Sequence, residues 1–305
     1  MTRDAKLSPF RGFLSAIMYP LILLGSLFAA AAVHSQGFDT GPTTGSILLT
    51  TGLLIWLLEY LMPYTDTWHP SKSQMGTDFL HSVFSSFLVA LLMRATLLAL
   101  FTEYGAKIAA NFGSSFWPSH WNVAAQLVLA LLIADLGAYT AHRMMHLTRV
   151  LWRIHAVHHS PEKMHFLAAG RTHPFNAIWT LTLENGPVLF LGISPEALML
   201  LSVYKGVNGF LQHSNIDLRP GFLSYILATN EVHWWHHSAV NKEAQHNYGN
   251  TTMIWDQVFR SFYLPKEVRP RVEVGIDNAH LGNNYLKHLA VPFTLQSYET
   301  NADYR

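Results

Sequence analysis

Residues 123–146 read VAAQLVLALLIADLGAYTAHRMMH, an apolar run that ends in two histidines four residues apart. The run is long enough to cross a hydrocarbon layer of ~30 Å as a helix. On that helix His142 and His146 point the same way, about one turn apart, so their imidazoles can share a metal ion. The sequence therefore predicts a membrane helix with a metal-binding end.

Composition supports a membrane protein. Half of the 305 residues are hydrophobic and only 13% are charged, which is too apolar for an ordinary soluble domain of this size. The formal net charge of +1 gives no basic excess that would favour nucleic acid as a partner. The absence of cysteine excludes disulfides, thiolate zinc sites and cysteine-bound iron–sulfur clusters. A metal would need nitrogen and oxygen ligands, and the chain has 18 histidines.

Four apolar stretches are long enough to span a membrane, and they cover residues 14–33, 46–62, 79–101 and 123–141. A fifth stretch, 177–211, is interrupted by Gly186-Pro187 and Ser194-Pro195, and proline breaks helix continuity. We expect this stretch to form a re-entrant or double-crossing hairpin of two short helices. The predicted fold class is all-α, a multi-pass membrane protein with a helical cap.

Charge predicts the orientation in the membrane. Arg3, Lys6 and Arg11 precede the first span, whereas the next connection, 34–45, has no Lys or Arg, so the N-terminus is expected to be cytoplasmic. A hairpin that returns to its starting side places the metal-site regions, 142–176 and 212–263, on the cytoplasmic side as well. We expect one domain over residues 1–305, with a tail at 264–305 packed against it. The pattern fits either a bacterial inner membrane or the endoplasmic reticulum.

Two further histidine clusters repeat one spacing. Both HAVHH at 155–159 and HWWHH at 233–237 follow the pattern HxxHH, in which the three imidazoles share a helix face. The three clusters supply eight candidate ligands, which are His142, His146, His155, His158, His159, His233, His236 and His237. Imidazole suits iron, zinc, copper and nickel, so ligand type does not choose the metal. Eight imidazoles exceed the need of one zinc and are enough for two metals with open positions.

Isolated histidines have a simpler expected role. We expect them to be surface or interfacial residues, and they are His34, His69, His120, His280 and His288.

The order HRMMH, HAVHHS and HWWHHS, followed by His246-Asn247-Tyr248-Gly249 and Trp255-Asp256, resembles the fatty acid hydroxylase and sterol desaturase superfamily. These are integral-membrane, histidine-box, non-haem di-iron enzymes, and the resemblance extends from about residue 59 to residue 259. It implies a centre of two non-haem iron ions that uses O2 to hydroxylate or desaturate a lipid C–H bond. It also implies a separate electron donor, such as a ferredoxin-like or cytochrome b5-like protein with its reductase.

Carried over residue by residue, the resemblance assigns metal binding and catalysis to the same eight histidines and adds His213, within Gln212-His213-Ser214-Asn215, as a metal ligand. Some relatives have a second histidine where this chain has Gly209, so the ninth and tenth ligands stay open. His173, within Arg171-Thr172-His173-Pro174, either completes the set or anchors a loop.

Residues around the ligands follow from spacing. Asp135 and Tyr139 lie on one helical stripe with His142 and His146, so Asp135 is predicted to orient a ligand imidazole through its second nitrogen. A helix-packing role is the alternative. Asn215 is a third candidate for this supporting layer.

Other polar residues lie in or near the predicted spans and are expected to form pairs or to line a substrate tunnel. They are Glu59, Asp78, His81, Arg94 and Glu184.

Three other functions compete with this reading. An acyl-CoA-type desaturase also uses histidine boxes, but its first box is usually wider than HxxxH. An intramembrane zinc hydrolase lacks its HExxH motif here and would leave most imidazoles unused. A metal transporter or store would need histidines along a path through the membrane. The lipid itself stays open, because sterols, fatty acyl chains, sphingoid bases, ether lipids and carotenoids all fit the resemblance.

Overall fold

The computed structural model describes residues 8–112, 116–265, 273–277 and 279–295, and every regular element within them is a helix. Four helices are long and apolar enough to cross a membrane, and they are Pro9–Ser35, Thr40–Leu61, Lys72–Asn111 and Val123–Leu147. The four predicted spans fall on these helices, which confirms the all-α multi-pass fold. Large apolar side chains on them, such as Phe28, Leu49 and Leu92, are exposed, as expected where lipid covers the protein.

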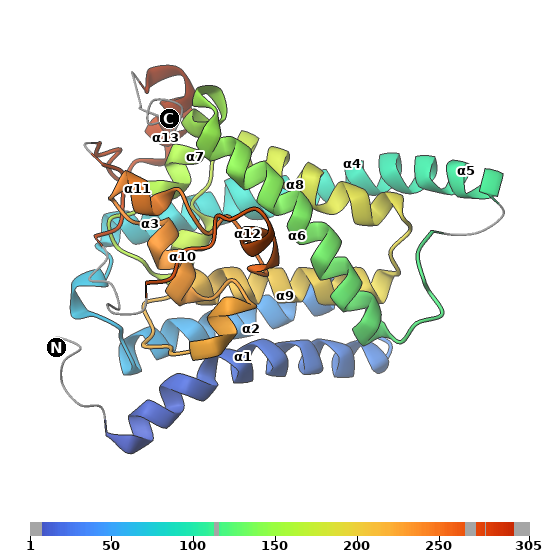
Figure 1. The fold of residues 1–305 in the computed structure, drawn as a ribbon, viewed down its shortest axis with the longest axis horizontal. Helices are drawn as coiled ribbons and strands as arrows, with labels where there is room; N and C mark the ends of the chain where they lie inside the picture. The colour runs from blue at the N-terminus through green and yellow to red at the C-terminus, as the bar shows by residue number, and fades with distance from the viewer. Residues whose placement is uncertain (1–7, 113–115, 266–272, 278, 296–305) are drawn as a thin grey trace.

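The first two spans are α1 (Pro9–Ser35) and α2 (Thr40–Leu61), which form an antiparallel pair against α9 (Pro195–His213). Their shared core contains Tyr19, Ile55 and Val203, all fully buried. Figure 1 shows these three helices side by side along the long axis of the molecule. The N-terminal hairpin thus supports the helix that carries His213.

The third span is a composite helix. It begins with α3 (Lys72–Leu80), whose first turn is capped by the Ser71 hydroxyl, and continues through α4 (Leu88–Leu97) to α5 (Glu103–Phe112). Two π-helical segments, η2 (His81–Phe87) and η3 (Leu98–Thr102), separate these pieces. Such segments shift the helical register, because each turn holds an extra residue. In Figure 1, α5 extends to the far end of the molecule from the cap.

The fifth apolar stretch forms the expected hairpin of two helices, α8 (Pro174–Phe190) and α9. The chain turns at Gly192, whose φ of +85° suits glycine, and Ser194 caps α9. The expected break at Gly186-Pro187 was wrong, because Pro187 lies inside α8. A proline cannot donate to the carbonyl four residues earlier, here Leu183, so the helix continues with one carbonyl freed.

The freed carbonyl meets α6 (Val123–Leu147) at Gly137. A Cβ atom added at Gly137 would lie 1.9 Å from the Leu183 oxygen, so the two helices touch through their backbones. Only glycine permits this approach, and its Cα–H groups can point at the carbonyl. The helices α6 and α8 are therefore pinned together inside the membrane region.

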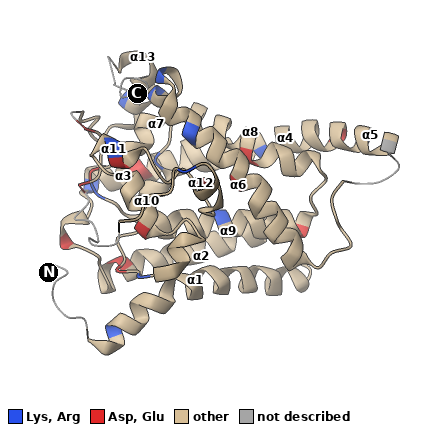
Figure 2. Cartoon of the chain, in the orientation of Figure 1, with Lys and Arg blue, Asp and Glu red and all other residues tan. Residues whose placement is uncertain are grey.

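A polar cap covers one end of the bundle. It contains α7 (Arg149–His159), α10 (Asn230–His236), α11 (Asn241–Ala244), α12 (Ile254–Val258) and α13 (Tyr285–Thr294), with the short turns η1 (Asp66–Trp68), η4 (Phe166–Gly170) and η5 (Gly221–Tyr225). Figure 2 shows that most charged residues gather at this end, whereas the long helices carry few.

The tail predicted at 264–305 is described only in part. Its helix α13 packs against α7, while residues 266–272, 278 and 296–305 lie outside the described residues. The structure thus places a polar layer, with part of the tail, over the ends of α6 and α9.

Candidate metal centre

Nine histidines meet where the cap joins the bundle. One group contains His142, His146, His155, His159 and His236, and the other contains His158, His213, His233 and His237. Within each group the ring nitrogens that could bind a metal lie within 4.8 Å of one another. They come from α6, α7, α9 and α10, with His237 as the C-cap residue of α10, and most are buried. Every histidine of the three predicted clusters, and His213, is therefore in one of the two groups.

Each HxxHH segment divides its histidines between the two groups. In α7, His155 and His159 enter the five-histidine group while His158 enters the four-histidine group. In α10 the arrangement is reversed, since His236 alone joins the five-histidine group. Neighbouring residues on an α-helix point about 100° apart, which explains how adjacent imidazoles reach different groups.

Hydrogen bonds fix the tautomer of five of these imidazoles. The Nδ1 atoms of His142, His158, His213 and His236 lie 2.7–3.1 Å from the backbone carbonyls of Tyr248, Arg171, Gly209 and His246. The Nδ1 of His155 lies 2.7 Å from Oδ1 of Asn176. A carbonyl oxygen only accepts, so each Nδ1 carries the hydrogen and donates it. Each Nε2 is left with a lone pair, the form in which imidazole binds metals.

The Nε2 atoms converge more closely than neutral lone pairs allow. The Nε2 of His159 lies 3.1 Å from Nε2 of both His146 and His155, and His159 has one hydrogen at most to place between them. The second group repeats this, with Nε2 of His233 3.1 Å from Nε2 of His213 and His237. Cations between the nitrogens would remove the repulsion.

Two further observations fit a metal. The Nε2 atoms of His142 and His236 are buried and form no hydrogen bond to any described residue. Burial lowers the pKa of His155, His159 and His236 well below the usual range, so these imidazoles are neutral and able to bind. The donor set is nitrogen only, which suits iron, zinc or copper.

Asp135 acts differently from the prediction. Its carboxylate accepts hydrogen bonds from the backbone N–H groups of Asn250, Thr251 and Thr252 and from the Thr252 hydroxyl, at 2.6–3.1 Å. The prediction that it orients a ligand imidazole was wrong, because two helical turns, about 10 Å, separate it from His142. It anchors the loop that follows Tyr248, whose carbonyl holds His142.

Tyr139 and Asn215 also brace loops. The Tyr139 hydroxyl pairs with that of Ser261 at 2.9 Å and accepts from Arg143. The Asn215 side chain bonds both the N–H and the carbonyl of Thr65. Neither side chain forms a hydrogen bond to a histidine of the two groups among the described residues, so both support loops around the site and do not contact the ligands.

His173 lies outside both groups, so its candidacy as a tenth ligand was wrong. Its Nδ1 accepts from the Phe175 N–H and caps α8, while its Nε2 donates to the Leu289 carbonyl. Both ring nitrogens are therefore used in anchoring a loop. Burial lowers the pKa of His173, which keeps Nδ1 free to accept.

Some important residues were not found from the sequence. Asn176 orients His155, and nothing in its spacing indicates this role. His288 was expected near the surface, yet it is buried with its Nδ1 3.0 Å from Nε2 of His81. The backbone carbonyls that hold four ligands have no signal in the sequence at all.

Comparisons with known proteins agree with this geometry. The family model for fatty acid hydroxylase matches residues 127–261, which include all nine grouped histidines. Ornithine lipid hydroxylase OlsE of Rhizobium tropici is 32% identical over 287 residues, which are 92% of this chain and 84% of that protein.

Two other relatives match more narrowly. Alkylglycerol monooxygenase of Homo sapiens is 30% identical over 151 residues, 50% of this chain and 33% of that protein. Sphinganine C4-monooxygenase 2 of Arabidopsis thaliana is 24% identical over 201 residues, 63% of this chain and 76% of that protein. No solved structure matches the chain significantly. By its match to a relative along most of both sequences, this chain belongs to the fatty acid hydroxylase superfamily and is an oxygenase-type enzyme.

Proposed function

We propose that this protein hydroxylates a membrane lipid, using O2 and two iron ions held by the nine grouped histidines. The observation that carries the proposal is the convergence of imidazole Nε2 atoms in two adjoining groups. Iron bound there would supply the activation of O2 that an unreactive C–H bond requires. Membership of a superfamily of oxygenases supports iron over zinc or copper.

The protein itself contributes orientation and a dry site. Carbonyl acceptors hold the imidazoles in one tautomer and one direction, so the ligands are preorganised before a metal binds. The rings of Trp152 and Tyr248 lie 5.1 and 5.2 Å from that of His146, which closes one side of the five-histidine group. Exclusion of water protects a reactive oxidant from side reactions.

Hydroxylation is favoured over desaturation. The relatives above are named for the hydroxylation of ornithine lipid or as monooxygenases of alkylglycerol and sphinganine. The reaction inserts one oxygen atom of O2 into a C–H bond and releases the other as water, which consumes two electrons and two protons. We propose that a separate ferredoxin-like or cytochrome b5-like protein supplies the electrons. Because the relative that matches most of the chain acts on ornithine lipid, an amine-bearing lipid is favoured over a sterol.

The chain is a membrane protein with four helices able to span the bilayer. We propose that the N-terminus and the metal centre face the cytoplasm and that residues 1–305 form one domain. Transport of metal is disfavoured, because both histidine groups lie at one end of α6 and α9 and do not follow the bundle.

Expression of the protein in a host under labelled dioxygen, followed by untargeted lipid mass spectrometry, tests the proposal. We compare the wild type with His158→Ala and His236→Ala, one from each histidine group, and with His280→Ala as control, because the His280 side chain is 83% exposed. The wild type and the control should yield a lipid that gains one labelled oxygen, and the other two variants should not. A product that only loses two hydrogens would instead identify a desaturase, and unchanged lipids with metal uptake a transporter.

A further inference from the structure

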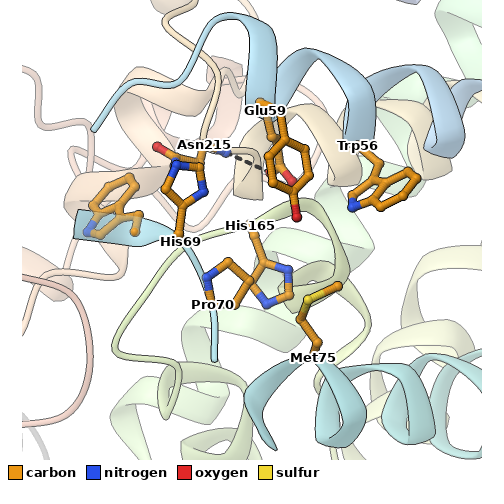
Figure 3. A pocket seen from close by; sticks show the side chains of 9 residues that line it. Trp56, Glu59, His69, Pro70, Met75, His165 and Asn215 are labelled. Carbon is orange, nitrogen blue, oxygen red and sulfur yellow. Dashed lines mark hydrogen bonds between the residues drawn. The ribbon is translucent and has the colours of Figure 1, made fainter. Parts of the chain in front are cut away.

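A small cavity of about 10 Å³, enough for one water-sized group, lies under the cap, between the end of α2, the turn η1 and the start of α3. Figure 3 shows Glu59 and Asn215 on one side of it and His165 and Met75 on the other. Asn215 is two residues beyond His213 of the four-histidine group. The cavity is therefore close in the chain to the metal centre but is lined by none of its histidines.

Glu59 is the acidic group of this cavity. Its side chain is almost fully buried, with 6% of the residue exposed. One oxygen, Oε1, accepts the backbone N–H groups of Phe166 and Asn215, both at 2.8 Å. The other oxygen, Oε2, forms no hydrogen bond to a described residue, and no described Lys or Arg pairs with it. One oxygen thus braces two loops, and the other is left for a ligand.

His165 lies across the cavity from Glu59. Its residue is 2% exposed, and its Nε2 lies 2.7 Å from Oδ2 of Asp78. Asp78 also pairs with the Arg171 guanidinium. Two buried polar side chains, Glu59 and His165, therefore line the same small space.

Aromatic rings complete the lining. Trp56 and Tyr60 flank Glu59 on α2, with ring centroids 5.9 Å apart at 90°, and Trp68 adds a third ring. The faces of such rings attract cations. Trp56 is 43% exposed and Tyr60 55% exposed, so the cavity adjoins the outer surface at the end of a membrane helix. Aromatic residues at that level lie among lipid headgroups.

We propose that this cavity binds the ammonium group of a lipid headgroup. The free carboxylate oxygen of Glu59 would accept its N–H groups, and the aromatic rings of the lining would lie beside its charge. An anionic group would be repelled by the Glu59 carboxylate, whereas an ammonium group would be attracted to it. The identification of this lipid as the substrate rests on the proposed function, but binding of the ammonium group does not.

Binding of octylammonium to the full-length protein in maltoside detergent tests the site without any turnover. Octanol, with the same chain and no charge, is the comparison ligand, and calorimetry gives both affinities. In Glu59→Gln the amide oxygen can still accept from Phe166 and Asn215, so only the charge is removed. Glu103→Gln is the matched control, because Glu103 is exposed and pairs with Lys107 on α5.

The wild type should prefer octylammonium to octanol, and Glu59→Gln should weaken octylammonium binding about tenfold or more, the usual loss for a charge-assisted hydrogen bond. Trp56→Leu should weaken it about two- to fivefold through the lost ring. Glu103→Gln should change nothing. The proposal would be overturned if the wild type bound octylammonium and octanol equally well. It would also be overturned if the wild type and Glu59→Gln bound octylammonium with equal affinity.

The two proposals fail separately. A protein that adds labelled oxygen to a lipid but shows no ammonium preference would contradict only the headgroup site. A protein that prefers octylammonium but yields no oxygenated lipid would contradict only the hydroxylase. If Glu59→Gln does not fold, the wild-type preference and Trp56→Leu still decide the question.

Discussion

The imidazoles of His158 and His159, adjacent in the chain, stand at 89° to each other with centroids 5.6 Å apart and belong to different histidine groups. If each group holds one metal, as proposed, replacing either by alanine removes a ligand from a different metal. His158→Ala leaves three histidines in its group, whereas His159→Ala leaves four in the other. We expect His158→Ala to bind about one iron per chain and His159→Ala to retain more, because ligand number sets affinity.

Iron content by elemental mass spectrometry, with Mössbauer spectra of the two variants, checks this. Each variant should lose a different spectral component. Identical spectra would contradict the division of the histidines into two groups.

The hydrogen bond from His155 to Asn176 should matter for metal affinity. Asn176→Leu removes the acceptor of the Nδ1 hydrogen, which frees the ring to rotate and to change tautomer. We expect iron affinity to fall about 10- to 100-fold, the usual effect of losing such a partner. Asn176→Asp keeps an acceptor for the Nδ1 hydrogen and should retain most of the iron affinity. Competition with a chelator measures the iron affinity of the wild type and of both variants. Equal affinities for Asn176→Leu and Asn176→Asp would refute the role of Asn176 in orienting His155.

Asp135 should stabilise the fold more than it affects the ligands directly. Asp135→Asn places an amide NH2 where the carboxylate accepts N–H and O–H groups from residues 250–252. The free energy of unfolding should fall by about 2–5 kcal/mol, since buried donors lose their acceptor. Thr252→Val removes a single donor and should cost about 1 kcal/mol. Denaturation in detergent compares them, and a smaller loss in Asp135→Asn than in Thr252→Val would contradict the prediction.

Acid should weaken the loop anchored by His173. Burial lowers the pKa of His173 in the folded protein, whereas in the unfolded chain it is about 6.5. Below that pH the unfolded state binds a proton that the folded state excludes, because Nδ1 is accepting from Phe175. The stability from this group is thus present above pH ~6.5 and lost as pH falls through the folded pKa.

His173→Asn tests this, because asparagine caps helices well and does not titrate. Its melting temperature should fall less than that of the wild type between pH 7 and pH 5, measured in detergent. Its iron content should stay unchanged, since His173 is in neither histidine group. A parallel pH dependence in both proteins would count against the role of His173.

The contact of Gly137 with Leu183 should tolerate no side chain. In Gly137→Ala a methyl group meets the Leu183 carbonyl at less than contact distance, so α6 and α8 must separate. Overpacking of this kind costs about 1–3 kcal/mol. Gly209 is also within a helix, but a Cβ atom added there would meet no atom of another segment within 4 Å, so Gly209→Ala should not lower the melting temperature. Thermal unfolding of the two variants decides, and equal melting temperatures would contradict the close approach.

The spans and the histidine clusters were predictable because both depend on local spacing. Helical periodicity brings His142 toward His146, and apolar length identifies a membrane helix, whatever the rest of the chain does. Helical geometry also explains why the histidines of each HxxHH segment enter different groups. This could be worked out only after the structure showed that the two segments face each other. Here α7 and α10 come from parts of the chain about 75 residues apart.

The supporting contacts were not predictable, because they join distant segments. The carbonyl that holds His142 is 106 residues away, and Glu59 bonds to residues 107 and 156 positions later. A carbonyl is present at every residue, so the sequence cannot mark the one that is used. Asp135 was misassigned for a related reason. A shared helical stripe shows that two side chains point the same way, but it does not show that one can contact the other.

The backbone contact between Gly137 and Leu183 joins the two helices that lead to the five-histidine group. His142 lies five residues beyond Gly137 on α6, about 7.5 Å, and Asn176 lies seven residues before Leu183 on α8, about 10 Å. Both helices thus run from one fixed point in the membrane region to the two walls of the five-histidine group. A bilayer whose thickness tilted α6 against α8 would change the spacing of the histidines, so we expect the geometry of the site to depend on membrane thickness.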